Sequence, residues 1–160
     1  MNSERIKRQF GSFGIDVIES SDERRVSSLY SLEDGGKVCR TYALVEFRQP
    51  IEPALAEEHN LVLAGQSIGA VFKSRGWTIT KRHTHVGSRM LTQDDEDIAG
   101  RMRLDVPQQV ALHSYVFEVV KEGALFDYAA ITELHHPLYL TEADLQSIYV
   151  RPTGEAASRT

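Results

Sequence analysis

Two stretches of alternating apolar and polar residues flank an Asp-Gly pair, and this feature constrains the fold more than any other in the chain. The stretches run over residues 25–32 and 37–47, and Glu33-Asp34-Gly35-Gly36 separates them. Alternation with a period of two is typical of a strand that buries one face. An Asp-Gly pair favours the two-residue turn of a β-hairpin, because both turn positions need a positive φ. The sequence therefore predicts an antiparallel hairpin over 25–47.

Four further stretches are predicted to be strands from their alternation or their length: residues 14–19, 77–89, 110–120 and 124–135. Helix caps and helical spacing predict helices over 53–63, 67–76, 94–104 and 141–150. This order of elements predicts an α+β domain over residues 1–150, in which a single antiparallel sheet of about six strands carries the helices on one face. Residues 151–160 are predicted to be a disordered tail.

The composition excludes several classes of function. A chain of 160 residues with 41% hydrophobic residues can bury a core as one domain. Its formal net charge of -5 argues against a nucleic-acid partner, which needs a basic face. The apolar runs are too short to span a membrane and no signal-peptide core follows Met1, so we expect no membrane partner and a cytoplasmic location. Cys39 is the only cysteine, which excludes an intrachain disulfide.

The stretch Gly65-Gln66-Ser67-Ile68-Gly69 is predicted to begin a helix close to a ligand. Ser67 is a favourable N-cap, and the two glycines let another group approach the backbone closely. Free amides at the start of a helix attract anions. The alternative is an ordinary capped helix in which the glycines have no role.

Histidines and basic residues suggest two further kinds of site. His83 and His85 share one strand face and could bind zinc together with His113, His135 or His136. We do not favour this, because histidines two apart on a strand are usually solvated or hydrogen-bonded, and the prediction is no metal and no cofactor. Several basic residues are predicted to form a positive rim that attracts an anionic substrate: Lys73, Arg75, Lys81, Arg82, His83 and Arg89.

The order of these motifs resembles the chorismate lyase family and the related effector-binding domains of bacterial transcription regulators. The resemblance rests on Arg40-Thr41 after the hairpin, on the loop over 65–69, and on Thr132-Glu133-Leu134 ahead of Pro137. Residues 3–10 and 15–18 also stand where the family has its first helix and first strand. The resemblance implies a chorismate lyase-like fold, and a carbon-oxygen lyase that releases pyruvate from chorismate and leaves a hydroxybenzoate.

The resemblance also implies which residues form the site. Arginine binds a carboxylate with two parallel hydrogen bonds. Glu133 lies in an otherwise apolar stretch, so we expect burial to raise its pKa and to let it hold a proton or accept a hydrogen bond from the substrate hydroxyl. Without the resemblance, Glu133 would be interpreted as an exposed strand residue and Arg40 as part of a surface ion pair. The expected catalytic residues are Glu133 and Arg40, and the expected substrate-binding residues are Arg25, Ser67, Ile68, Gly69 and His113.

The chain departs from the family at the arginine that binds a substrate carboxylate. Ser27 stands nearest to that position, with Arg25 two residues away on the same strand face, and His113-Ser114 replaces an Arg-Ser pair. The alternative function is therefore a non-catalytic domain of the same fold that binds a small anionic aromatic or cyclohexadiene ligand. The residues ahead of Ile15 are too few for the winged helix of the regulators, which favours the enzyme. The oligomeric state is not predicted.

Overall fold

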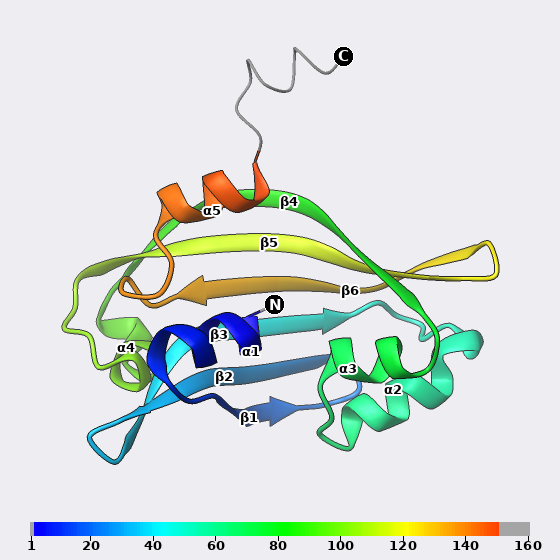
Figure 1. Cartoon of the computed structure of the whole chain (residues 1–160), viewed down its shortest axis with the longest axis horizontal. Coiled ribbons are helices and arrows are strands. Elements are labelled where there is room, and N and C mark those ends of the chain that lie inside the picture. Colours follow the sequence, from blue (N-terminus) through cyan, green and yellow to red (C-terminus); the bar gives the residue numbers. More distant parts are fainter. Residues whose placement is uncertain (1, 151–160) are drawn as a thin grey trace, which may run out of the picture.

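The structure, a computed structural model, describes residues 2–150 and has one open six-stranded antiparallel sheet with five α-helices (Figure 1). The α+β class and the antiparallel sheet expected from the sequence are confirmed. The predicted tail over 151–160 lies outside the described residues. In the part of the chain that is described, no helix has the length and apolar character needed to cross a membrane.

The strands are β1 (Gly14–Ser20), β2 (Arg24–Glu33), β3 (Gly36–Phe47), β4 (Thr78–Leu91), β5 (Gln108–Lys121) and β6 (Ala124–His135). The helices are α1 (Asn2–Phe10), α2 (Ala56–Leu63), α3 (Ile68–Ser74), α4 (Glu96–Met102) and α5 (Glu142–Tyr149). Short 3-10 turns, η1 (Pro53–Leu55) and η2 (Gln93–Asp95), precede α2 and α4. The helices predicted over 53–63 and 94–104 therefore each begin with a 3-10 turn.

Two tight turns of the sheet have the backbone conformation of a two-residue hairpin turn. Asp34 and Gly35, between β2 and β3, have φ of 52° and 77°. Glu122 and Gly123, between β5 and β6, have φ of 52° and 82°. Two successive positive φ values characterise the turn whose twist matches that of the flanking strands. The hairpin predicted over 25–47 is confirmed.

The strand order β1-β2-β3-β6-β5-β4 places the last strand of the chain in the middle of the sheet. The chain leaves the sheet after β3, passes through α2 and α3, and returns at the far edge as β4. β5 and β6 then fill the space back to β3. As a result, Glu133 on β6 lies directly between Ala43 on β3 and His113 on β5.

Helices cover both faces of the sheet, so the prediction that they lie on one face is wrong for α4. Glu133 belongs to the face covered by α1, α2, α3 and α5, and Leu134 must face the other way because strand side chains alternate. Leu134 packs with Ala99 and Met102 of α4. Figure 1 shows α1 and α3 in front of the sheet, on the side that carries Glu133.

Candidate functional site

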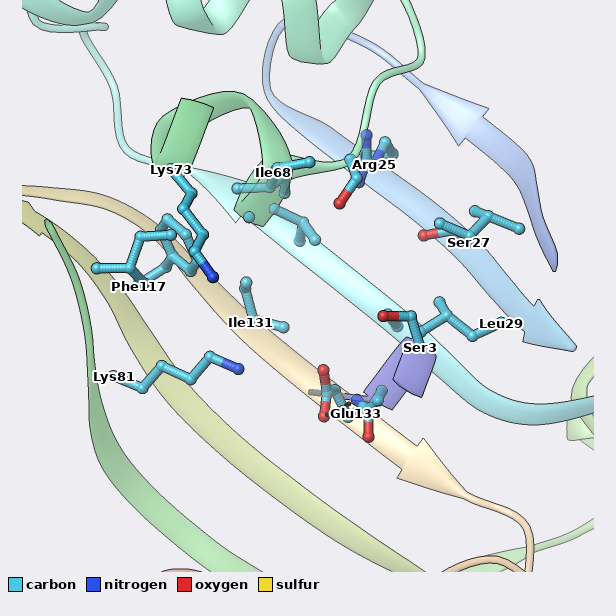
Figure 2. Close-up of a pocket in the computed structure, with 18 of the residues that line it drawn as sticks. Ser3, Arg25, Ser27, Leu29, Ile68, Lys73, Lys81, Phe117, Ile131 and Glu133 are labelled. Atoms are coloured by element: carbon cyan, nitrogen blue, oxygen red, sulfur yellow. Dashed lines mark hydrogen bonds between the residues drawn. The ribbon is translucent and has the colours of Figure 1, made fainter. Parts of the chain in front are cut away.

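A cavity of about 760 Å³ lies between the sheet and the helices α1 and α3. This volume is in the range typical of small-molecule sites. Most of its wall is apolar and includes Ile68, Trp77, Phe117 and Ile131. Figure 2 shows Arg25 beside Ile68 at one end and Glu133 at the other, with Ile131 between them.

Arg25 is a buried cation in the cavity wall. Its side chain comes from β2, the whole residue is only 6% exposed, and its Nη1 donates a hydrogen bond to the carbonyl oxygen of Gln66 over 3.0 Å. Its Nε has no hydrogen-bond partner among the described residues, and no carboxylate of residues 2–150 forms an ion pair with it. Burial lowers the pKa of Arg25, but a guanidinium stays charged in proteins. A buried charge normally has a partner, so Arg25 points to an anion that enters the cavity.

Two lysines of the predicted positive rim also line the cavity. Lys73 comes from α3 and Lys81 from β4, and Figure 2 shows the two side chains on either side of Ile131, with Lys73 above it and Lys81 below. Both residues are exposed, so they lie at the solvent side of the cavity. The arginines of the same run are paired with carboxylates instead: Arg75 with Glu57 and Glu58, Arg82 with Glu118 and Asp127, and Arg89 with Asp95.

Glu133 is the only carboxylate among the described residues that lines the cavity. Its Oε2 accepts a hydrogen bond from the Tyr115 hydroxyl over 3.0 Å, and its Oε1 accepts one from Asn2 Nδ2 over 3.1 Å. Burial by itself raises the pKa of Glu133, but His113, His135 and Lys81 outweigh that effect and lower its pKa well below the ordinary value. The expected raised pKa is therefore wrong, because the histidines and the lysine stabilise the carboxylate. Glu133 is ionised and accepts hydrogen bonds.

Two buried histidines face Glu133 from outside the cavity lining. His113 Nδ1 and His135 Nε2 lie 3.7 Å and 3.6 Å from the same oxygen, Glu133 Oε1. Neither nitrogen has a hydrogen-bond partner within the described chain. The other ring nitrogens are engaged: His135 Nδ1 with Thr41 Oγ1 at 2.8 Å, and His113 Nε2 with His83 Nδ1 at 2.7 Å. Burial lowers the pKa of His135 to about 4, so its imidazole is neutral at pH 7.

The predicted loop over 65–69 contributes Ser67, Ile68 and Gly69 to the cavity wall. Ser67 occupies the N-cap position of α3, but its side chain makes no capping hydrogen bond. The predicted N-cap position of Ser67 is therefore confirmed, although its hydroxyl satisfies none of the free amides of the helix. The loop lies against the cavity, as expected for a segment close to a ligand.

Arg40 does not line the cavity. Its Nε donates to Ser31 Oγ over 2.9 Å, and its Nη2 lies 3.4 Å from Glu33 Oε2. Its guanidinium carbon lies 3.8 Å from the centre of the Phe10 ring. These contacts occupy the guanidinium within the fold, so Arg40 has no place in the site proposed below.

Sequence reasoning did not identify Tyr115, Asn2 or His135 as neighbours of Glu133. The signal for two of them was present, since strand alternation places Tyr115 on the face of His113 and His135 on the face of Glu133. No short-range pattern indicates Asn2, because it reaches Glu133 across 131 residues of sequence.

No protein-family model matches the chain, and no curated protein matches it. Its class is therefore defined by the fold and the cavity. It is an α+β protein in which an open antiparallel sheet and its covering helices enclose a largely apolar cavity with a buried cation at one end and a carboxylate at the other.

Proposed function

We propose that the protein is a chorismate lyase-type enzyme, which releases pyruvate from chorismate and leaves a hydroxybenzoate. The observation that carries the proposal is Arg25, a buried guanidinium in an apolar cavity without a carboxylate partner in residues 2–150. Such a group favours a ligand with a carboxylate and an apolar ring. The type of reaction that we propose comes from the resemblance of the sequence motifs to the lyases.

The charged groups of the cavity can bind the polar groups of chorismate. Arg25 can bind the ring carboxylate, and Lys73 and Lys81 can bind the carboxylate of the enolpyruvyl side chain. Glu133 can accept a hydrogen bond from the ring hydroxyl. The ring itself then contacts Ile68, Phe117 and Ile131, among the apolar residues of the wall.

An ionised Glu133 is compatible with this chemistry. Chorismate contains the same atoms as pyruvate and hydroxybenzoate together, so the reaction takes up no net proton and no water. The protein has to hold both carboxylates, orient the ring and exclude competing water. A hydrogen bond from the ring hydroxyl to the fixed carboxylate of Glu133 contributes to this orientation.

A non-catalytic domain that binds a small anionic ring compound is the second candidate. It is favoured by the position of Arg40, because one of the two residues expected to be catalytic lies outside the cavity lining. The two candidates share the ligand class and differ only in turnover. A cytoplasmic location stays a prediction for both.

The deciding experiment is to incubate the purified protein with chorismate and to measure pyruvate and hydroxybenzoate over time. The lyase proposal expects both products in equal amounts, at a rate well above the spontaneous decay of chorismate. Titration with the hydroxybenzoate in a calorimeter measures binding separately. Hydroxybenzoate binding without pyruvate release would favour the non-catalytic candidate over the enzyme. If the protein neither binds hydroxybenzoate nor releases pyruvate, the cavity does not bind this class of ligand.

A further inference from the structure

We propose that His113, Glu133 and His135 form a binding site for one divalent transition-metal ion of the zinc type. The three side chains are buried, and one potential ligand atom from each lies within 4.8 Å of the other two. This inference goes beyond the proposed function and does not depend on it, because the site is defined by side chains that meet without any ligand in the cavity.

The spacing of these atoms suits a metal ion better than hydrogen bonds. His113 Nδ1 and His135 Nε2 lie 3.7 Å and 3.6 Å from Glu133 Oε1, which is too long for a direct N–H···O hydrogen bond. An ion with bonds of about 2.1 Å holds two ligand atoms about 3.4 Å apart at a tetrahedral angle, and farther apart at wider angles. The observed gaps therefore match two atoms that share an ion.

The second nitrogen of each imidazole is already fixed by a partner, as is usual for metal ligands. His135 Nδ1 lies 2.8 Å from Thr41 Oγ1, and when it donates there, the lone pair of Nε2 is left facing Glu133. His113 Nε2 lies 2.7 Å from His83 Nδ1, and in the opposite tautomer, in which Nε2 donates to His83, the lone pair of His113 Nδ1 is left facing Glu133. These are the neutral tautomers that a bound metal ion selects, and in them two lone pairs and one carboxylate oxygen converge.

The carboxylate is also held in place. Tyr115 donates to Oε2 and Asn2 donates to Oε1, which fixes the plane of the carboxyl group. No lysine or arginine of residues 2–150 forms an ion pair with Glu133. A buried carboxylate whose only ion-pair partners are imidazoles is strongly stabilised when a cation binds beside it.

Two imidazoles and one carboxylate are the ligand set of many zinc sites that keep an open position. Imidazole nitrogen also suits copper, nickel and iron, so the class is a first-row transition metal rather than calcium or magnesium. Glu133 is the one ligand of the three that lines the cavity. A metal bound here would therefore lie next to the cavity wall.

The test uses the full-length protein after treatment with a chelator and removal of the chelator. Zn²⁺ is titrated in competition with a chromophoric chelator, and Co²⁺ is added separately to record its visible spectrum. We expect one Zn²⁺ per chain with a dissociation constant below about 1 μM, and Co²⁺ absorption bands typical of four or five ligands. Binding weaker than about 1 mM, or only the pale spectrum of hydrated Co²⁺, would overturn the site.

Substitutions identify the ligands. His113→Ala and His135→Ala should each weaken Zn²⁺ binding at least ~100-fold, and His83→Ala, which removes a partner of a ligand, about 10-fold to 100-fold. His85→Ala is the matched control, since His85 is exposed on the same strand as His83 and outside the cluster, and its affinity should not change. Equal losses in His85→Ala and His113→Ala would show surface binding and contradict the proposal.

Two controls separate metal binding from loss of folding and from enzyme activity. Circular dichroism shows whether each variant folds, and if His113→Ala and His135→Ala do not, the Co²⁺ spectrum of the wild type decides alone. Metal binding is measured without chorismate, and pyruvate release is measured with and without Zn²⁺. A protein that binds no metal can thus still be a lyase, and one that binds metal can still be inactive.

Discussion

Arg24 and Arg25 are neighbours in sequence, yet their guanidinium groups lie in opposite environments. Strand side chains alternate, so Arg25 enters the cavity wall while Arg24 extends into solvent beside Glu19, with 47% of its side chain exposed. Among the described residues, Arg25 has no carboxylate partner and is buried, whereas Arg24 is weakly paired and hydrated. This contrast isolates the role of the buried cation.

We predict that Arg25→Met weakens binding of a hydroxybenzoate about 10-fold to 100-fold. The change removes charge-assisted hydrogen bonds of about 1.5–3 kcal/mol and keeps an apolar side chain in the wall. Arg24→Met should leave the affinity unchanged. Calorimetric titration of both variants is the measurement, and equal losses would rule out Arg25 as the anion site.

A second buried charge has a structural role and gives a pH-dependent prediction. Glu58 is 5% exposed, accepts a hydrogen bond from Trp77 Nε1 over 3.0 Å and pairs with Arg75. Burial by itself raises the pKa of Glu58, but the hydrogen bonds from Trp77, the backbone and Arg75 outweigh it and lower its pKa. A lowered carboxyl pKa stabilises the fold above the unfolded-state pKa, and this stabilisation is lost as the pH falls through the folded-state pKa.

Glu58→Gln should therefore lower the free energy of unfolding by about 1–3 kcal/mol at pH 7. The difference from the wild type should shrink below about pH 4, where the wild-type carboxyl group also becomes protonated. Glu57→Gln is the control, because the Glu57 side chain is 81% exposed and its pair with Arg75 contributes little. Urea unfolding at several pH values measures the stability of both variants and of the wild type. A difference between Glu58→Gln and the wild type that does not change with pH would contradict the prediction.

Among the elements, β3 shows how one extra residue changes which side chains can meet. Leu29 of β2 pairs with Thr41, but the next residue, Tyr30, pairs with Cys39, so Arg40 has no residue opposite it. A bulge of this kind interrupts the alternation of the strand. The guanidinium of Arg40 contacts Ser31, Glu33 and Phe10, and none of these three residues lines the cavity.

Two glycines in different elements should respond to alanine in opposite ways. Gly35 has φ of 77° in the turn between β2 and β3, and Gly35→Ala should destabilise the fold by about 1 kcal/mol because a side chain is strained there. Gly100 lies in α4, and a Cβ added to it meets nothing within 4 Å, so Gly100→Ala should stabilise the fold by about 0.5–1 kcal/mol. Thermal unfolding measures whether each substitution raises or lowers the melting temperature. A change in the same direction for both variants would contradict the explanation from backbone conformation.

At the scale of the whole molecule, the sheet separates the residues that line the cavity from the residues that pack against α4. The face that carries the cavity holds Arg25 and Glu133, whereas the other face packs Leu134 against Met102 of α4. Met102 is fully buried on the second face, and none of the hydrophobic residues in its cluster lines the cavity. Stability and ligand binding should therefore respond to different substitutions.

Met102→Ala tests this separation. The cavity that it leaves should lower the free energy of unfolding by about 2–5 kcal/mol, while the hydroxybenzoate affinity of the folded protein stays the same. Arg25→Met should show the reverse pattern. Affinity and unfolding free energy are measured on each variant at a temperature where both are folded, and a loss of affinity in Met102→Ala would mean that the two faces are coupled.

The sequence by itself determined the local structure: the turn at Asp34-Gly35, the strands and most helix boundaries, because turn residues and alternation act within a few residues of each other. It also indicated Arg25, Glu133 and the loop over 65–69 as candidates for one site. Only the tertiary structure decided that β6 lies beside β3, that α4 covers the opposite face, and that the β3 bulge removes Arg40 from strand alternation. It also decided the low pKa of Glu133, because that pKa depends on His113 and Lys81, which reach it from other strands. Contacts between distant residues follow from how whole elements pack, and no short-range pattern in the chain records that packing.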